Sequence, residues 1–132
     1  MKNYHCLIVD DSAPIVLLVK NFLQRIPFFS QIASCSSASE ALEILSTQKI
    51  DLLILDIELS DFSGMTLLKG IPQATVPPTI IISSHSEYAV ESYEVGKAAD
   101  FLKKPFDFER FLLAVNRALA IVLTKSSFSD KD

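Results

Sequence analysis

Short runs of apolar residues recur along the chain, with little polar alternation inside each run. Runs of this kind are typical of strands in a parallel sheet that is covered on both faces. The pattern therefore predicts five strands, which are Tyr4–Val9, Ile32–Cys35, Leu52–Leu55, Thr79–Ser83 and Ala99–Leu102.

Apolar residues between these runs recur at intervals of three and four, which places them on one face of a helix. Two further helices are expected, a weaker and shorter one over residues 64–70 and another over residues 87–95. The three stronger patterns are Ile15, Leu18, Phe22 and Ile26; Ala38, Ala41, Leu42 and Leu45; and Phe108, Phe111, Leu112, Val115, Leu119 and Val122.

Residues at the helix boundaries agree with these patterns. Serine and aspartate are favoured just before a helix, proline is tolerated in its first turn, and glycine is favoured at its end. The residues expected in these roles are Ser12 with Pro14, Ser37 or Ser39, Asp107 and, as a stop, Gly96.

Strand and helix alternate five times, which predicts an α/β fold with a (βα)5 doubly wound, five-stranded parallel sheet of the flavodoxin-like kind. Right-handed crossovers bring the carboxyl ends of all strands to one edge, where such sheets hold their sites. One domain is expected over residues 1–123. Residues 124–132 (TKSSFSDKD) are polar and show no periodicity, so we expect a flexible tail or the start of a linker.

The composition suits a single cytoplasmic domain. A chain of 132 residues with 49% hydrophobic residues and a mean hydropathy of +0.33 can bury a core. A net charge of −4 argues against a nucleic-acid-binding surface. Cys6 and Cys35 lie in apolar runs and are expected to be buried, reduced thiols. The first apolar run is too short for a signal peptide, and no stretch has membrane-spanning length.

Polar residues break the apolar pattern just after the expected strands. Asp10 and Asp11 follow the first strand, Asp56 ends the third, and the Ser83–Ser84 pair ends the fourth. Lys104, followed by Pro105, comes after the fifth. The predicted fold brings all of them to the same edge of the sheet.

Three carboxylates in one cleft repel one another and raise one another's pKa, and a divalent cation relieves this repulsion. Oxygen ligands of this kind suit Mg²⁺ (or Mn²⁺). An aspartate can also attack phosphorus to form an acyl phosphate. The Lys104 ammonium and the Ser83 hydroxyl are suitable partners for the phosphoryl oxygens. Asp10, Asp11 and Asp56 are therefore the candidate metal and phosphoryl site.

The same residues carry a family resemblance. Taken in order, four motifs resemble the receiver domain of two-component response regulators over residues 4–123. The motifs are DD at Asp10 and Asp11, LILDIELSDFSG at Leu53–Gly64, IIISS at Ile80–Ser84 and DFLKKPF at Asp100–Phe106. The resemblance implies that Asp56 accepts the phosphoryl group. It also implies Mg²⁺ ligation by the side chains of Asp11 and Asp56 and by the backbone carbonyl of Glu58, with Asp10 acting partly through water.

The resemblance implies further roles at the rim of the site. Ser83 matches the switch hydroxyl of the family, Phe101 its aromatic switch residue and Lys104 its invariant lysine, which precedes a cis proline. Glu58 and His85 occupy the variable positions that tune the lifetime of the phosphate. A chain of this kind is not an enzyme with an external substrate, because it catalyses only its own aspartyl phosphorylation and dephosphorylation.

The chain departs from the family pattern at four positions. Ser60 stands where proline is usual, which predicts a less rigid loop after Asp56. Ser63 replaces a common Asp or Asn, and Ser84 replaces a smaller residue, which narrows access to the site. Phe101 replaces the commoner tyrosine and lacks its hydroxyl.

The resemblance also suggests partners. Residues 86–119 resemble receivers that are joined to a LytTR-type DNA-binding domain. The expected phosphodonor is a sensor histidine kinase. The face built by the fourth helix, the fifth strand and the fifth helix is expected to change on phosphorylation and to serve a homodimer or an effector, with Tyr88, Val95 and Phe101 nearby. No membrane contact is expected.

Three alternatives compete with this interpretation. The string that begins at Asp56 is faintly similar to the nucleophile motif of haloacid-dehalogenase-type phosphatases, but their motif ends the first strand. A flavodoxin-like cofactor binder needs a hydroxyl-rich phosphate loop after the first strand, where Asp10 and Asp11 would repel the phosphate. The third alternative is a receiver that works without phosphorylation, as an interaction module only.

Overall fold

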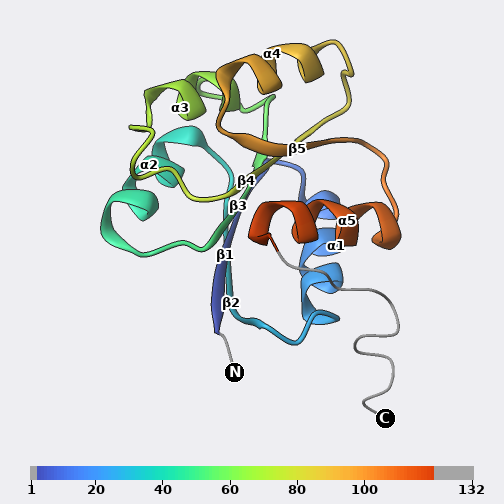
Figure 1. Cartoon of the computed structure of the whole chain (residues 1–132). Coiled ribbons are helices and arrows are strands. Elements are labelled where there is room, and N and C mark those ends of the chain that lie inside the picture. The colour runs from blue at the N-terminus through green and yellow to red at the C-terminus, as the bar shows by residue number, and fades with distance from the viewer. Residues whose placement is uncertain (1–2, 121–132) are drawn as a thin grey trace.

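The computed structural model describes residues 3–120, which form ten elements in strict strand–helix alternation (Figure 1). The strands are β1 (Tyr4–Val9), β2 (Phe29–Cys35), β3 (Leu52–Asp56), β4 (Thr79–Ser83) and β5 (Ala98–Lys103). The helices are α1 (Ala13–Gln24), α2 (Ala38–Thr47), α3 (Gly64–Gly70), α4 (Tyr88–Val95) and α5 (Phe108–Leu119).

The strands form one parallel sheet in the order β2-β1-β3-β4-β5. Helices α1 and α5 cover one face, and α2, α3 and α4 cover the other (Figure 1). The predicted α/β class and doubly wound sheet are therefore confirmed. The strand order reverses at β1, so the carboxyl ends of β1 and β3 lie side by side at the point where such sheets hold their sites.

The sheet separates two hydrophobic cores, because neighbouring strand residues point to opposite faces. In β3, Leu52 and Ile54 pack with α1 and α5, whereas Leu53 and Leu55 pack with α2, α3 and α4. All residues of β3 and β4 are buried. Burial on both faces explains why these strands are read as continuous apolar runs.

Three strands are longer than predicted. β2 begins at Phe29 rather than Ile32, and its added residues pair with the start of β1. Ser30 and Gln31 are polar, but β2 is an edge strand and exposes them to solvent. β3 continues to Asp56, and β5 extends by one residue at each end. Apolar content alone thus underestimates the length of strands that end in functional or exposed polar residues.

The helix predictions need correction at several positions. Ile26 lies beyond the end of α1, because Pro27 disfavours helical backbone at the residue before it, yet its side chain is buried. Leu42 fits the predicted core face but is 42% exposed. Residues 87–95 give a helix that begins at Tyr88, with Glu87 at the N-cap position. Val122 lies outside the described residues.

The capping predictions are largely confirmed. Asp107 caps α5 by accepting from Arg110 N, and Ser37 rather than Ser39 caps α2 by accepting from Glu40 N. Ser12 occupies the N-cap position of α1, but its side chain makes no capping hydrogen bond. Further helix-end residues that behave as predicted are Pro14, in the first turn of α1, and Gly96, whose φ of 77° ends α4 in the left-handed region.

The two cysteines are free thiols, but only Cys6 is fully buried. Cys35 ends β2 and is partly exposed, which corrects the expectation that both are buried. Burial raises the pKa of the Cys35 thiol to about 11, so the thiol stays protonated near neutral pH. None of the helices between residues 3 and 120 has the length and apolar character of a transmembrane segment. The expected tail over residues 124–132 lies outside the described residues.

Candidate functional site

Three carboxylates meet where β1 and β3 end. Asp10 follows β1, Asp11 is the next residue, and Asp56 is the last residue of β3. One carboxylate oxygen from each of the three lies within 4.8 Å of the others. Asp10 and Asp56 are each only 2% exposed, whereas Asp11 is exposed. The cluster is thus open to solvent on the side of Asp11 and enclosed by protein elsewhere.

Lys104 brings a positive charge to this cluster from the turn after β5. Its Nζ lies 2.9 Å from Asp10 Oδ2 and 3.5 Å from Asp56 Oδ2. Its backbone N–H donates to Ser83 O, and the bond to Pro105 is cis. Lys103 is exposed, as strand alternation predicts. The structure therefore distinguishes the two adjacent lysines and brings Lys104 to the predicted place.

The electrostatics of the cluster are unfavourable for a second buried negative charge. Burial, and then the neighbouring Asp10 carboxylate, raise the pKa of Asp56 to about 6. The Lys104 ammonium and a hydrogen bond from Glu58 N (3.3 Å to Oδ1) offset this only in part. Asp10 Oδ1 accepts from Ser12 N, but the buried Oδ2 makes no hydrogen bond within the described chain despite its closeness to Lys104.

This donor set fits a divalent cation. Three ionised carboxylates against one ammonium leave two uncompensated negative charges, and a divalent ion carries the matching charge. The buried Asp10 Oδ2 lacks a hydrogen-bond partner among the described residues, and the three candidate ligands all offer carboxylate oxygens, which Mg²⁺ and Mn²⁺ prefer. Residues with a carboxylate available to such an ion are Asp10, Asp11 and Asp56.

Glu58, Ser83 and His85 form a polar bridge between the ends of β3 and β4. His85 Nε2 lies 2.8 Å from Glu58 Oε2, and His85 Nδ1 lies 3.6 Å from Glu87 Oε2. The Ser83 hydroxyl accepts from His85 N at 3.0 Å and lies 3.4 Å from Glu58 Oε1. Ser84 is exposed, so Ser83 is the serine engaged at this edge.

Phe101 is only 7% exposed and packs in the core on the α2, α3 and α4 face of the sheet. Tyr88, Val95 and Ala98 are partly buried beside the same core. The aromatic ring therefore already lies inward in this structure. Phe101 therefore lies on the side of α4, together with Tyr88 and Val95, which the sequence analysis also singled out.

The loop that follows Asp56 is closed at its base by Gly64. Gly64 N donates to Ile57 O at 2.8 Å, which brings the start of α3 against the end of β3. A Cβ on Gly64 would lie 2.2 Å from the backbone oxygen of Asp56, well inside van der Waals contact. Glycine is required here because of close backbone approach.

Gly64→Ala is expected to displace the loop and lower the free energy of unfolding by about 1–3 kcal/mol, because the added methyl overlaps backbone atoms. Gly70→Ala is the matched control at the other end of α3. Nothing lies within 4 Å of a Cβ at Gly70, so we expect little change. Urea unfolding of both variants measures the difference, and equal stability of the two would contradict the assignment.

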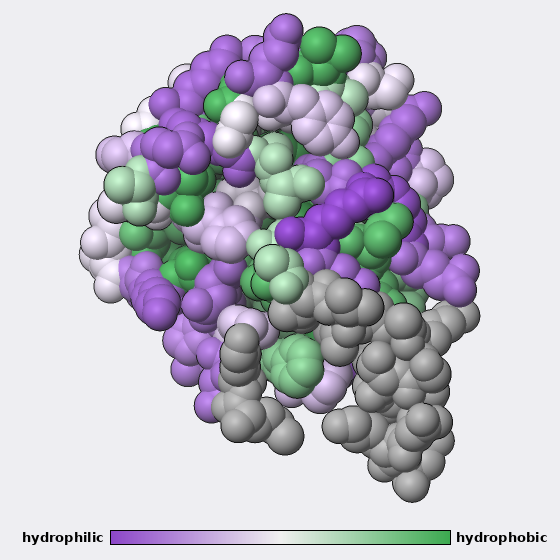
Figure 2. Space-filling view, in the orientation of Figure 1, coloured by the Kyte–Doolittle hydropathy of each residue, from purple (hydrophilic) through white to green (hydrophobic). Residues whose placement is uncertain are grey.

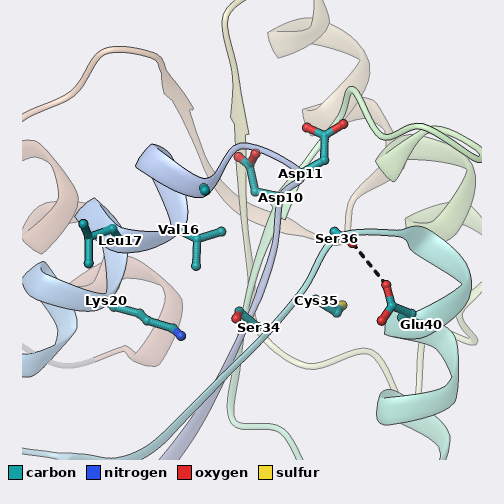
Figure 3. Close-up of a pocket in the computed structure, with 10 residues that line it drawn as sticks. Asp10, Asp11, Val16, Leu17, Lys20, Ser34, Cys35, Ser36 and Glu40 are labelled. Carbon is teal, nitrogen blue, oxygen red and sulfur yellow. Dashed lines mark hydrogen bonds between the residues drawn. The ribbon is translucent and has the colours of Figure 1, made fainter.

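A pocket of about 460 Å³ opens beside the carboxylates, between α1 and α2 (Figure 3). Asp10 and Asp11 lie at its upper end, and Val16, Leu17 and Lys20 line it from α1. Ala13 also lines the pocket from α1, and the other lining residues come from the end of β2, the turn after it and the start of α2, with Ser36 donating to Glu40. Leu17 is 61% exposed, so an apolar surface adjoins the acidic cluster.

Asp100 forms a buried ion-pair network that was not predicted from the sequence. The carboxylate is 1% exposed and accepts from Arg110 (2.8 and 3.0 Å), Arg117 (3.0 Å) and Phe101 N (2.8 Å). Burial opposes ionisation, but Arg110 and these other donors hold the pKa of Asp100 below its ordinary value. The sequence feature that could have indicated this network is an aspartate inside the apolar run of β5.

Asp61 was also missed. It lies in the loop after Asp56, and its carboxylate binds the first residues of α2. Hydrogen bonds from Ser39, Ala38 and Phe62 hold the pKa of Asp61 well below its usual range. No local pattern could reveal this residue, because its partner Ser39 lies 22 positions earlier in the chain.

Comparison with known proteins agrees with this geometry. The family model for the response regulator receiver domain matches residues 6–116. The sensory transduction protein LytR of Staphylococcus haemolyticus is 38% identical over 112 residues, which cover 84% of this chain and 43% of that protein. LytT of Enterococcus faecalis is 31% identical over 115 residues, which cover 86% of this chain and 47% of that protein. The chain spans less than half the length of these relatives.

Solved structures give the same result. The signal receiver domain of an HD domain-containing protein from Pseudomonas fluorescens has a TM-score of 0.80 and 25% identity, covering 90% of this chain and 96% of that one. The response regulator TrrA from Thermotoga maritima, in complex with Mg²⁺ and BeF, has a TM-score of 0.77 and 28% identity, covering 90% and 100%. The family match, the sheet order and the convergence of the carboxylates agree, and the chain belongs to the response regulator receiver domains of two-component systems.

Proposed function

We propose that the chain accepts a phosphoryl group on Asp56, in a reaction that depends on Mg²⁺ (or Mn²⁺), and that a sensor histidine kinase is the donor. The observation that carries this proposal is the buried Asp56 carboxylate, which lies against two other carboxylates and 3.5 Å from the Lys104 ammonium. A nucleophile, a cation site and a fixed positive charge thus share one edge of the sheet. The transfer of a phosphoryl group to a carboxylate requires these three groups.

Asp56 acts as the nucleophile. A carboxylate oxygen of Asp56 forms a bond to phosphorus while the bond from phosphorus to the donor breaks. The electron pair of the broken bond leaves with the histidine nitrogen of a kinase or with the acetate of acetyl phosphate. The raised pKa of Asp56 increases the basicity of its carboxylate, which favours attack once the proton is removed.

The side chains of Asp10, Asp11 and Asp56 would hold the metal together with the backbone carbonyl of Glu58, and Asp10 would act partly through water. When bound, Mg²⁺ supplies positive charge to the phosphoryl oxygens. Lys104 is already paired with Asp10 and Asp56, so a short movement of its Nζ brings it to a phosphoryl oxygen. Ser83 donates its hydroxyl to another of these oxygens.

Glu58 and His85 tune the lifetime of the acyl phosphate. Their 2.8 Å contact links the loops after β3 and β4 beside the reaction site. The Ser83 hydroxyl is engaged with the same pair, at 3.4 Å from Glu58 Oε1 and 3.0 Å from His85 N. Ser83 must leave these partners to reach the phosphoryl group, so the strength of the bridge affects both phosphorylation and hydrolysis.

The output surface is the α4–β5–α5 face, which serves a homodimer or an effector. Phe101 already lies inward, so phosphorylation acts chiefly through Ser83 and the start of α4, as a population shift between two arrangements. The face combines exposed apolar side chains, Val90 (66%), Tyr93 (55%) and Leu113 (43%), with arginines on α5. Figure 2 shows strongly hydrophilic residues beside apolar ones in the region of α5. This composition supports a docking role.

The family relatives support a larger assembly. LytR of Staphylococcus aureus is named as a transcriptional regulatory protein and is 34% identical to this chain, which spans 46% of its length. We propose that residues 1–123 form the receiver domain, that residues 124–132 begin a linker, and that a LytTR-type DNA-binding domain follows in the complete regulator. The receiver itself binds neither nucleic acid nor membrane in this proposal, and the protein acts in the cytoplasm.

The test is intact-mass measurement after incubation with acetyl phosphate, with Mg²⁺ in one sample and EDTA in the other. We expect an added phosphoryl group in the first sample only, and we expect peptide mapping to place it on Asp56. A beryllofluoride complex observed by ¹⁹F NMR is the independent readout. A folded protein that gains no phosphoryl group and binds no beryllofluoride would favour a module that works without phosphorylation.

A further inference from the structure

We infer that Asp61 is a positioning residue, which clamps the loop after Asp56 to the start of α2 and so sets the affinity of the site for divalent cations. This inference rests on the proposed function, because it assumes that the Glu58 carbonyl in this loop is a metal ligand. Asp61 itself lies outside the carboxylate cluster and touches neither the metal nor the phosphoryl group in this scheme.

The clamp consists of a carboxylate with both oxygens engaged. Oδ1 accepts from Ala38 N at 3.0 Å and from Phe62 N at 2.9 Å. Oδ2 accepts from Ser39 N at 2.9 Å and from the Ser39 hydroxyl at 2.7 Å. A carboxylate at a helix N-terminus satisfies amides that have no partner within the helix and interacts favourably with the helix dipole. The loop is thereby tied to a helix from a different part of the chain.

The loop needs such an anchor because its own sequence does little to restrict it. Residues 57–63 contain no proline, and Ser60 leaves the backbone free where a proline would restrict φ. At its base the loop is fixed by the hydrogen bond from Gly64 N to Ile57 O. Leu59 and Phe62 pack against the core, but they are only partly buried. Asp61 adds directional hydrogen bonds to this apolar packing.

The anchored segment includes the proposed metal ligand. Glu58 lies two residues after Asp56, to which its N–H donates, and three residues before Asp61. The backbone between these two attachments is too short to move at Asp61 without reorienting the intervening carbonyls. Residues that orient metal ligands from outside commonly change metal affinity by roughly 10–100-fold when removed.

A second residue at the same helix end allows a matched control. Ser37 caps α2 locally, since its hydroxyl accepts from Glu40 N at 3.2 Å. Asp61 and Ser37 therefore divide the amides at one helix terminus between them, but only Asp61 connects that terminus to the loop. Ser37→Ala weakens the helix end and leaves the clamp in place, whereas Asp61→Ala removes both a cap and the clamp.

The experiment is a calorimetric titration of the full chain with Mg²⁺ and with Mn²⁺, without any phosphodonor. We expect Asp61→Ala to bind each ion about tenfold more weakly than wild type and Ser37→Ala to bind within about twofold of wild type. Asp61→Asn keeps one acceptor oxygen and should fall between wild type and Asp61→Ala. It also serves if Asp61→Ala does not fold. Amide hydrogen exchange of residues 57–63 should quicken in Asp61→Ala and not in Ser37→Ala.

The possible outcomes are distinguishable. A wild-type chain that binds neither ion would overturn the proposed function as well as the clamp. If wild type binds and Asp61→Ala binds equally well, or if Ser37→Ala weakens binding as much as Asp61→Ala does, the clamp is overturned while the proposed function stands. Weaker binding confined to the Asp61 variants, together with faster exchange in the loop, supports the inference.

Discussion

Asp56→Asn is expected to take up no phosphoryl group from acetyl phosphate and, in the absence of divalent ions, to unfold at a higher temperature than wild type. The first effect follows because an amide is not a nucleophile toward phosphorus and no other carboxylate takes its place at the end of β3. The second follows because the substitution removes a buried negative charge that faces Asp10. Intact mass and thermal unfolding in EDTA measure the two effects.

The size of the stability gain follows from the pKa. Raising the pKa of Asp56 from 3.8 to about 6 makes its ionised form costly in the fold. Allowing for screening by water near the exposed Asp11, we expect a gain of about 1–3 kcal/mol at neutral pH. Because the folded pKa exceeds the unfolded one, the stability that this group contributes is present below about pH 4 and is lost as pH rises through 6. The advantage of Asp56→Asn should therefore disappear in acid.

Asp51→Asn is the control for this prediction. Asp51 precedes β3, is partly buried and accepts from His5 N at 2.8 Å, far from the carboxylate cluster. We expect this variant to keep the phosphoryl adduct and to lose some stability. A phosphoryl adduct on Asp56→Asn, or a lower melting temperature of that variant in EDTA, would contradict the assignment of Asp56.

Arg110→Ala is expected to lower the free energy of unfolding by about 3 kcal/mol, because it leaves the buried Asp100 carboxylate with much less compensation. Arg110 donates from two nitrogens to Asp100 and from one to Phe101 O. The pKa of Asp100 is lowered in the fold, so this contribution is present above its unfolded pKa and is lost as pH falls through the folded value. Urea unfolding at neutral and acid pH measures it.

Arg117→Ala is the matched control on the same helix. Arg117 makes one contact with Asp100, at 3.0 Å, and its side chain is 52% exposed against 36% for Arg110. A single ion pair with a more exposed partner contributes about 1 kcal/mol or less to the free energy of unfolding. If the two variants lose equal stability, the two guanidinium groups share the carboxylate evenly, and Arg110 is not its dominant partner.

Much of the fold follows from local patterns, and the exceptions have physical causes. Buried strands such as β3 and β4 show as continuous apolar runs because both of their faces are covered. The edge strand β2 was only half recognised, because one of its sides faces water. Leu42 fits the helical period of α2 but is exposed, since periodicity does not measure how far the opposing layer extends.

The site divides in the same way. Asp10, Asp11, Asp56 and Lys104 could be predicted because each interrupts an apolar pattern at the end of a strand, and parallel topology brings strand ends together. The role of Asp61 and the partners of Asp100 could not be predicted in this way. Their hydrogen bonds join segments that are distant in the sequence and come together only in the folded chain. The alternative of a haloacid-dehalogenase-type phosphatase is excluded by the family match, and Asp56 ends the third strand rather than the first.

The sheet that separates the two cores also has a consequence for how the chain can evolve. Leu52 and Ile54 share their neighbours with α1 and α5, while Leu53 and Leu55 share theirs with α2, α3 and α4. A change in side-chain volume on one face of the sheet therefore cannot be compensated by a change on the other face, because the two cores share no side chain. A substitution in one core therefore has to fit only the side chains of that core. Two related chains can diverge in one core and still have interchangeable side chains in the other.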